Sequence, residues 1–277
     1  MNIGIRAHDI EKLPLEELVK VIADKGLTSV QLALAKSLDF NTANGSLSPG
    51  IAYHVGSAFR QKNIQIAVLG CYINMIHPDK EERRKALERF KEHLRYARDF
   101  GCSIVGTETG NVNAEMGYTE ENFKEEPFGE VVTSVRELVA EAEKFGVIVG
   151  VEAGVNHPIY SAAALKRLLD NVPSNNLQVI LDPANLITAD TYKDQDEIIK
   201  EAFELLGDRL AIIHAKDFVI EEGKLKFVPI GTGQLNYDLI MKLVKEKKPF
   251  INILMEDTQE PYIDGSISYL RNKYEGV

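Results

Sequence analysis

The sequence has little that would favour a membrane, a secretory route or a nucleic acid. No apolar run approaches the roughly 20 residues that a membrane-spanning helix needs, and the start, MNIGIRAHDIEK, carries charges where a signal peptide would be apolar. Lys and Arg number 32 against 42 Asp and Glu, so the net charge is −10. Without an overall basic field, binding to a phosphate backbone is disfavoured. We expect a cytoplasmic protein that binds neither membranes nor nucleic acids.

Cysteine is equally scarce. Cys71 and Cys102 form no CxxC pattern, which fits a reducing compartment and argues against a thiolate metal site. We expect both to be small buried apolar residues. Nucleotide-binding and HExxH motifs are missing as well, and the glycine pair Gly231 and Gly233 is too short for a dinucleotide fingerprint. Nicotinamide and nucleotide triphosphate chemistry therefore have no support.

What the sequence does contain is a regular alternation of short β-branched runs and longer amphipathic stretches. This alternation is typical of consecutive βα units around a parallel sheet. Eight strands are predicted, the number that closes a (β/α)8 TIM barrel. No linker or low-complexity segment interrupts the chain, so we expect an α/β fold with a single TIM-barrel domain over residues 1–277. The predicted strands cover residues 2–6, 29–33, 65–71, 104–107, 147–152, 177–182, 210–214 and 251–256.

Amphipathic helices are predicted between these strands. Gly26, Gly101 and Gly146 each stand just past a helix end, where the left-handed cap conformation costs glycine little. His54 and His93 fall within helical patterns, and we predict that both lie on the outer surface without a role. The predicted helices cover residues 14–25, 48–62, 80–100, 127–145, 161–171, 195–206 and 237–247.

Two of the predicted loops are longer than the rest. Residues 109–126 form a polar loop after the fourth strand, and residues 218–231 after the seventh strand suggest a hairpin with Glu222-Gly223 as its turn. Both follow strands at the end of the barrel where active sites are built. These short insertions are therefore expected to border the site.

The candidate chemistry lies where the last four strands end. Glu152, Asp182, His214 and Glu256 each close an apolar run. The carboxyl ends of barrel strands meet at one face, so four adjacent strands would bring these side chains together. Three carboxylates repel one another unless a cation lies among them, and three oxygen ligands with one imidazole suit a hard or borderline divalent ion. We expect one divalent metal ion, with Mn²⁺, Mg²⁺ or Co²⁺ favoured and Zn²⁺ also allowed.

A metal centre of this kind suits proton transfer beside a carbonyl group. A metal on a ketose carbonyl oxygen and a neighbouring hydroxyl acidifies the adjacent C–H and stabilises an enediolate. One carboxylate, from the fifth or the eighth strand, would remove a proton, and the other would return it. Return to the opposite face gives epimerisation, and return to the neighbouring carbon gives aldose–ketose isomerisation. The residues alone leave this choice open.

The strand-end residues Glu152, Asp182, His214 and Glu256, with HAKD at 214–217 and VPIGTG at 228–233, resemble the xylose-isomerase-like barrel superfamily. The resemblance covers nearly the whole chain and is to the sugar phosphate isomerase/epimerase and ketose 3-epimerase branch. It implies that all four residues bind one divalent metal and that the two glutamates are the proton-transfer pair. It further implies a small-molecule sugar or sugar phosphate as substrate and a homodimer or homotetramer.

Eight further residues near the strand ends are candidate substrate contacts, although each could instead be structural. Asn185 stands where the better-known epimerases carry a histidine, and Pro158 stands where ketose 3-epimerases have a substrate-binding carboxylate, so the sugar and the reaction stay open. Lys216 could bind a phosphate or hydroxyl, or could pair with a nearby carboxylate. The candidates are His157, Lys216, Asn185, His77, Asn74, His8, Glu108 and Gln31.

Three other functions are alternatives to an isomerase or epimerase. A dehydratase of a keto-polyol, such as an inosose, can begin with the same enediolate-forming step. An abasic-site endonuclease needs more strand-end histidines than this chain offers and a basic groove, which the net charge of −10 disfavours. A non-catalytic sugar-binding barrel has no need of two ionised glutamates on a metal.

Overall fold

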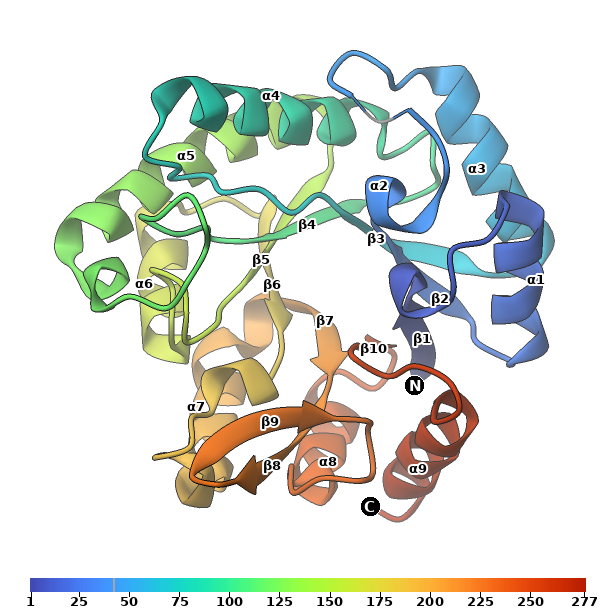
Figure 1. The fold of residues 1–277 in the computed structure, drawn as a ribbon, viewed down its shortest axis with the longest axis vertical. Helices are drawn as coiled ribbons and strands as arrows, with labels where there is room; N and C mark the ends of the chain where they lie inside the picture. Colours follow the sequence, from blue (N-terminus) through green and yellow to red (C-terminus); the bar gives the residue numbers. More distant parts are fainter. Residues whose placement is uncertain (42) are drawn as a thin grey trace.

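The computed structural model describes residues 1–41 and 43–277, and its centre is a closed barrel of eight parallel strands (Figure 1). The strands follow one another in the order β1-β10-β7-β6-β5-β4-β3-β2, and the barrel closes where β1 pairs with β2 and with β10. The predicted TIM barrel is confirmed, and each predicted strand agrees with an observed one to within one residue at either end. The barrel strands are β1 (Asn2–Arg6), β2 (Ser29–Leu32), β3 (Gln65–Gly70), β4 (Ile104–Glu108), β5 (Ile148–Glu152), β6 (Leu177–Leu181), β7 (Leu210–Ala215) and β10 (Asn252–Met255).

Helices surround this barrel (Figure 1). Every predicted helix is present, although the one predicted over residues 80–100 ends at Tyr96. The short α2 and the last helix α9 lie outside the predicted set. Helix α9 buries Ile263, Ile267 and Leu270, a stripe with helical spacing that the sequence already contained. The helices are α1 (Leu15–Asp24), α2 (Leu34–Ser37), α3 (Pro49–Gln61), α4 (Lys80–Tyr96), α5 (Glu125–Phe145), α6 (Ala162–Asn171), α7 (Gln195–Leu206), α8 (Tyr237–Lys247) and α9 (Ile263–Glu275).

The interior of the barrel is filled by apolar side chains that determine where the site lies. Ile180, Ile212 and Leu254 belong to one interior cluster, and each stands two residues before a predicted ligand. Alternate residues of a strand face the same side, so Asp182, His214 and Glu256 continue the inward-facing rows of their strands. The apolar layer thus forms the base on which the polar side chains lie.

Both predicted insertions are present. The hairpin after β7 consists of β8 (Asp217–Glu221) and β9 (Lys224–Val228), and Glu222 and Gly223 both have positive φ angles, 51° and 74°, as a two-residue hairpin turn requires. In Figure 1 the hairpin is drawn in orange, between the labels of α7 and α8. The loop after β4 contains a 3-10 helix at Glu120–Phe123. These insertions lie on either side of the loops that follow β5 and β6 in the strand order.

The prediction that His93 lies on the outer surface is wrong. Its side chain is buried on the inner face of α4, where Nδ1 lies 2.8 Å from the Arg89 carbonyl oxygen. His54 is exposed, as expected, and Cys71 and Cys102 are both buried free thiols. Among the described residues, no helix combines the length and the apolar character that crossing a membrane requires.

Candidate metal and proton-transfer site

Four ionisable side chains meet at the carboxyl ends of neighbouring strands. Glu152 ends β5, Asp182 follows β6, His214 lies in β7 and Glu256 follows β10. Each offers a ligand atom, and these atoms all lie within 4.8 Å of one another. All four residues are at most 4% exposed. The structure therefore brings together the four residues predicted as metal ligands.

The donor atoms of this cluster fit a divalent cation. Asp182 Oδ2, His214 Nδ1 and Glu256 Oε2 are buried without a well-formed hydrogen bond, and the two oxygens share the ammonium group of Lys216. Buried polar atoms ordinarily have a partner, because leaving them unpaired costs about 1–3 kcal/mol each. Burial also raises the pKa of Asp182 to about 6, so its ionised form needs a compensating charge. Three carboxylates and one imidazole would supply that ion with oxygen and nitrogen ligands.

His214 is oriented by a second layer of contacts. Its Nε2 lies 2.8 Å from Gln31 Oε1, so Nε2 donates this hydrogen bond and Nδ1 is directed at the cluster. Nδ1 lies 3.1 Å from Glu152 Oε2 and 3.4 Å from Glu256 Oε2. The Gln31 amide in turn donates to the Tyr72 hydroxyl. Gln31, a candidate substrate contact, is thus placed against a metal ligand and is 2% exposed.

Asn185 and Lys216 connect the cluster to the space above it. The Asn185 amide donates to Glu152 Oε1 at 2.7 Å, and Lys216 Nζ donates to Asn185 Oδ1 at 3.1 Å. Lys216 Nζ also lies 3.0 Å from Glu256 Oε2 and 3.3 Å from Asp182 Oδ2. Lys216 therefore pairs with carboxylates and also lies at the bottom of a cavity. Its position is compatible with both predicted roles, the salt bridge and the substrate contact.

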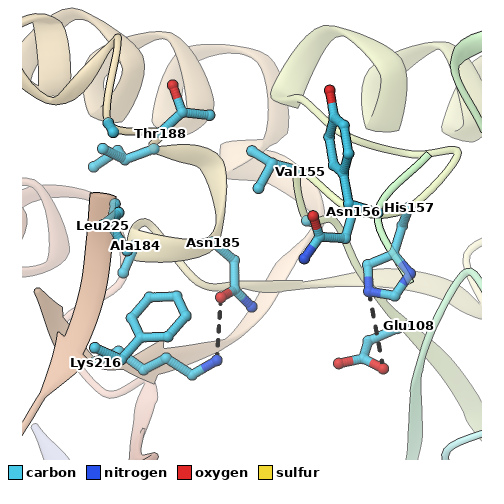
Figure 2. Close-up of a pocket in the computed structure, with 14 residues that line it drawn as sticks. Glu108, Val155, Asn156, His157, Ala184, Asn185, Thr188, Lys216 and Leu225 are labelled. Carbon is cyan, nitrogen blue, oxygen red and sulfur yellow. Dashed lines mark hydrogen bonds and ion pairs between the residues drawn. The ribbon is translucent and has the colours of Figure 1, made fainter. Parts of the chain in front are cut away.

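A cavity of about 470 Å³ opens above these residues (Figure 2). Asn185 and Lys216 face each other on one side of it, and His157 and Glu108 lie on the other. The His157 ring is fixed by its Nδ1, 2.8 Å from the Gly110 carbonyl oxygen, with Nε2 4.0 Å from Glu108 Oε2. Four predicted substrate contacts therefore line this cavity. The remaining lining residues are Tyr118, Gly154, Val155, Asn156, Ala184, Ile187, Thr188, Ala189, Leu225 and Phe227.

The other three candidate contacts lie elsewhere around the mouth. The Asn74 amide holds the loop after β4, with Nδ2 2.8 Å from the Asn111 carbonyl oxygen and Oδ1 3.0 Å from its N–H. His77 Nδ1 accepts from the Asp79 N–H at the start of α4. His8 packs edge-on against Tyr72, with ring centroids 6.2 Å apart. None of these three residues is among the described residues that line the cavity.

Arg6 is a site residue that the sequence reasoning missed. It ends β1, and its guanidinium contacts Glu256 Oε1 and lies 2.6 Å from Asp257 Oδ1. The Asp9 carboxylate accepts two hydrogen bonds from the same guanidinium, at 2.9 Å from Arg6 Nε and at 2.8 Å from Arg6 Nη2. Although burial opposes it, the charges of His214, Lys216 and Arg6 lower the pKa of Glu256 to about 2. The sequence did contain a signal for this residue, because Arg6 ends the first predicted strand just as Glu256 ends the last.

We expect Arg6→Lys to lower kcat by about tenfold to a hundredfold, the usual effect of removing a contact that orients a ligand. Lysine keeps the charge but cannot hold Asp9 with two parallel bonds while contacting Glu256. Steady-state kinetics should show that kcat falls while KM changes little. Arg271→Lys on α9, where the side chain is exposed, is the matched control. A drop in melting temperature large enough to unfold the variant under the assay conditions, and so to explain the loss of kcat, would instead assign Arg6 a purely structural role.

This geometry defines a class of protein: α/β barrels with a cluster of carboxylates and one imidazole at the strand ends. The family model described as xylose isomerase-like TIM barrel matches residues 19–273. The chain belongs to that family, as its strand-end residues suggested.

Solved structures share this fold. A D-tagatose 3-epimerase-like protein superposes with a TM-score of 0.78 at 18% identity, covering 100% of this chain and 98% of its own. The IOLI protein with a bound zinc atom gives 0.75 at 16% identity, covering 99% and 96%. The probable 3-DHS dehydratase AsbF of petrobactin synthesis from Bacillus anthracis gives 0.76 at 14% identity, covering 98% and 99%. At these identities the likeness is one of fold.

Proposed function

We propose that this protein is a divalent-metal-dependent isomerase or epimerase of a ketose sugar, with Glu152 and Glu256 as its proton-transfer pair. The observation that carries the proposal is the buried cluster of three carboxylates and one imidazole at the strand ends. Glu152, Asp182, His214 and Glu256 would hold the ion. When bound, a divalent ion would polarise the carbonyl of a ketose and so acidify the neighbouring C–H.

The position of the two glutamates in the barrel supports their shared role. In the strand order, β6 and β7 separate β5 from β10, so Glu152 and Glu256 reach the cluster from different sides. A proton removed by one carboxylate can therefore be returned by the other on a different face or at a neighbouring carbon. Asn185 fixes Glu152 Oε1, and Arg6 holds Glu256 Oε1. In each glutamate the second oxygen, Oε2, is directed at the cluster.

The residues above the cluster would orient the substrate. Lys216 can donate to a substrate oxygen from the cavity floor, and His157 presents Nε2 from the opposite side. Apolar side chains such as Val155 and Leu225 line the same cavity and would limit the water around a bound substrate. Proton transfer in such a site gains from fixed hydrogen-bond donors, because they need no reorganisation during the reaction.

The test is incubation of the Mn²⁺-loaded protein with ketoses and ketose phosphates in D₂O, followed by proton NMR. Deuterium exchange at C3 would identify a 3-epimerase, and exchange at C1 or C2 would identify an isomerase. Loss of water from the product would replace the proposal with a dehydratase, which shares the first proton abstraction. No exchange with any member of a broad panel, in protein shown to contain the metal, would contradict the proposal.

A further inference from the structure

The cavity above the cluster has a charged and polar floor and a wall with an apolar part. The floor carries Glu108, His157, Asn185 and Lys216. Val155, Ile187, Ala189, Leu225 and Phe227 form the apolar part of the wall, and Tyr118, Asn156 and Thr188 complete the lining. Phe227 connects the two parts, because its ring centroid lies 5.0 Å from Lys216 Nζ. A volume of about 470 Å³ falls within the range of about 300–1,000 Å³ that is typical of small-molecule sites.

The charges of the floor do not suit an anionic substituent. Among the described lining residues, the basic side chains are Lys216 and His157. The Lys216 charge is balanced by Asp182 and Glu256, and His157 is bonded to a backbone carbonyl and faces Glu108. Glu108 adds a negative charge to the same floor. A phosphate in this cavity would have to draw Lys216 away from Asn185 and the two carboxylates, because it is the one lysine or arginine among the described lining residues.

The glycine turn after the hairpin is closed to phosphate as well. TIM barrels often bind substrate phosphates with the loops after strands seven and eight. Here the buried carboxylate of Asp217 fills that turn, because its Oδ2 accepts from the N–H groups of Gly231 and Gly233 at 3.0 Å each. Its Oδ1 accepts from the N–H groups of Phe218 and Leu235 at 2.9 Å each. A substrate phosphate would have to displace this internal anion.

We infer, on the basis of the proposed function, that the substrate is an uncharged ketose extended by a neutral second ring, and is not a sugar phosphate. The ketose end would lie at Asn185 and Lys216. The second ring would pack its C–H face on Phe227 and Leu225 of β9. Aromatic side chains contribute both buried area and a defined packing geometry to such contacts.

Binding of matched ligands to the Mg²⁺-loaded protein, measured by calorimetry, tests this inference. The ligands are the four D-ketohexoses, their 6-phosphates and isomaltulose, which is fructose with a glucosyl group on O6. We expect isomaltulose to bind about tenfold more tightly than fructose, a difference typical of one added aromatic contact. We expect each phosphate to bind about tenfold more weakly than its parent sugar, because the lysine of the floor is already engaged and Glu108 repels an anion.

Two variants test the wall directly. Phe227→Ala should lower the preference for isomaltulose over fructose by about fivefold, within the range of an aromatic contact. Phe250→Ala is the control, because this phenylalanine is 82% exposed and precedes β10 at the other end of the barrel. Tighter binding or faster exchange of a phosphate than of its parent sugar would overturn the inference while leaving the proposed function intact. Isomaltulose binding no more tightly than fructose would overturn its second-ring part, and proton exchange in D₂O with none of the ligands would contradict the proposed function itself.

Discussion

Glu152→Gln should lower turnover by about a thousandfold or more while the barrel remains folded, because an amide cannot accept the proton that the carboxylate removes. Glutamine has nearly the same shape, and its carbonyl oxygen can still accept from the Asn185 amide. Its own amide can donate to Nδ1 of a neutral His214, which lies 3.1 Å from the present Glu152 Oε2. The fold should therefore tolerate the change although the reaction does not.

The same loss is expected for Glu256→Gln, since the reaction needs both an acceptor and a donor of the proton. The measurement is steady-state turnover with the best sugar, together with circular dichroism to verify the fold. Glu204→Gln is the matched control, because Glu204 is exposed on α7, away from the cluster. Full activity in either active-site variant would remove that glutamate from the mechanism.

Divalent metal should raise the melting temperature by about 10 °C when present at about a thousand times its Kd, which corresponds to roughly 4 kcal/mol. The physical reason is that three buried carboxylates repel one another, and that Asp182 Oδ2 and Glu256 Oε2 share a single ammonium group, that of Lys216. A cation that binds only the folded chain relieves both costs. Differential scanning calorimetry in Mn²⁺ and in chelator measures this shift independently of any activity.

Asp182→Asn should abolish most of that shift. The asparagine oxygen can still accept from the N–H groups of Ala184 and Asn185, as Asp182 Oδ1 does, so the metal-free variant should be about as stable as the parent protein. It removes one charge from the cluster and with it one ligand of the ion. Asp170→Asn on the exposed side of α6 is the control. A metal-induced shift of the same size in Asp182→Asn would show that the ion binds somewhere else.

The sequence by itself determined the barrel and the four residues of the cluster. Four apolar runs predict the strands, and the residue that ends each run predicts the polar end of its strand. These residues are Glu152, Asp182, His214 and Glu256. In a parallel barrel all such ends meet at one face, so local patterns are sufficient to predict the convergence. The hairpin turn at Glu222-Gly223 is a local feature for the same reason.

Only the tertiary structure decided which other residues complete the site. Arg6 meets Glu256 because β1 and β10 pair where the barrel closes, and no local pattern records a contact between residues so far apart in the chain. Gln31 lies against His214 although β2 and β7 are not neighbours, since both side chains face the barrel axis. Hydrogen-bond partners across a barrel depend on register and side-chain direction, which the spacing of residues along one strand does not specify.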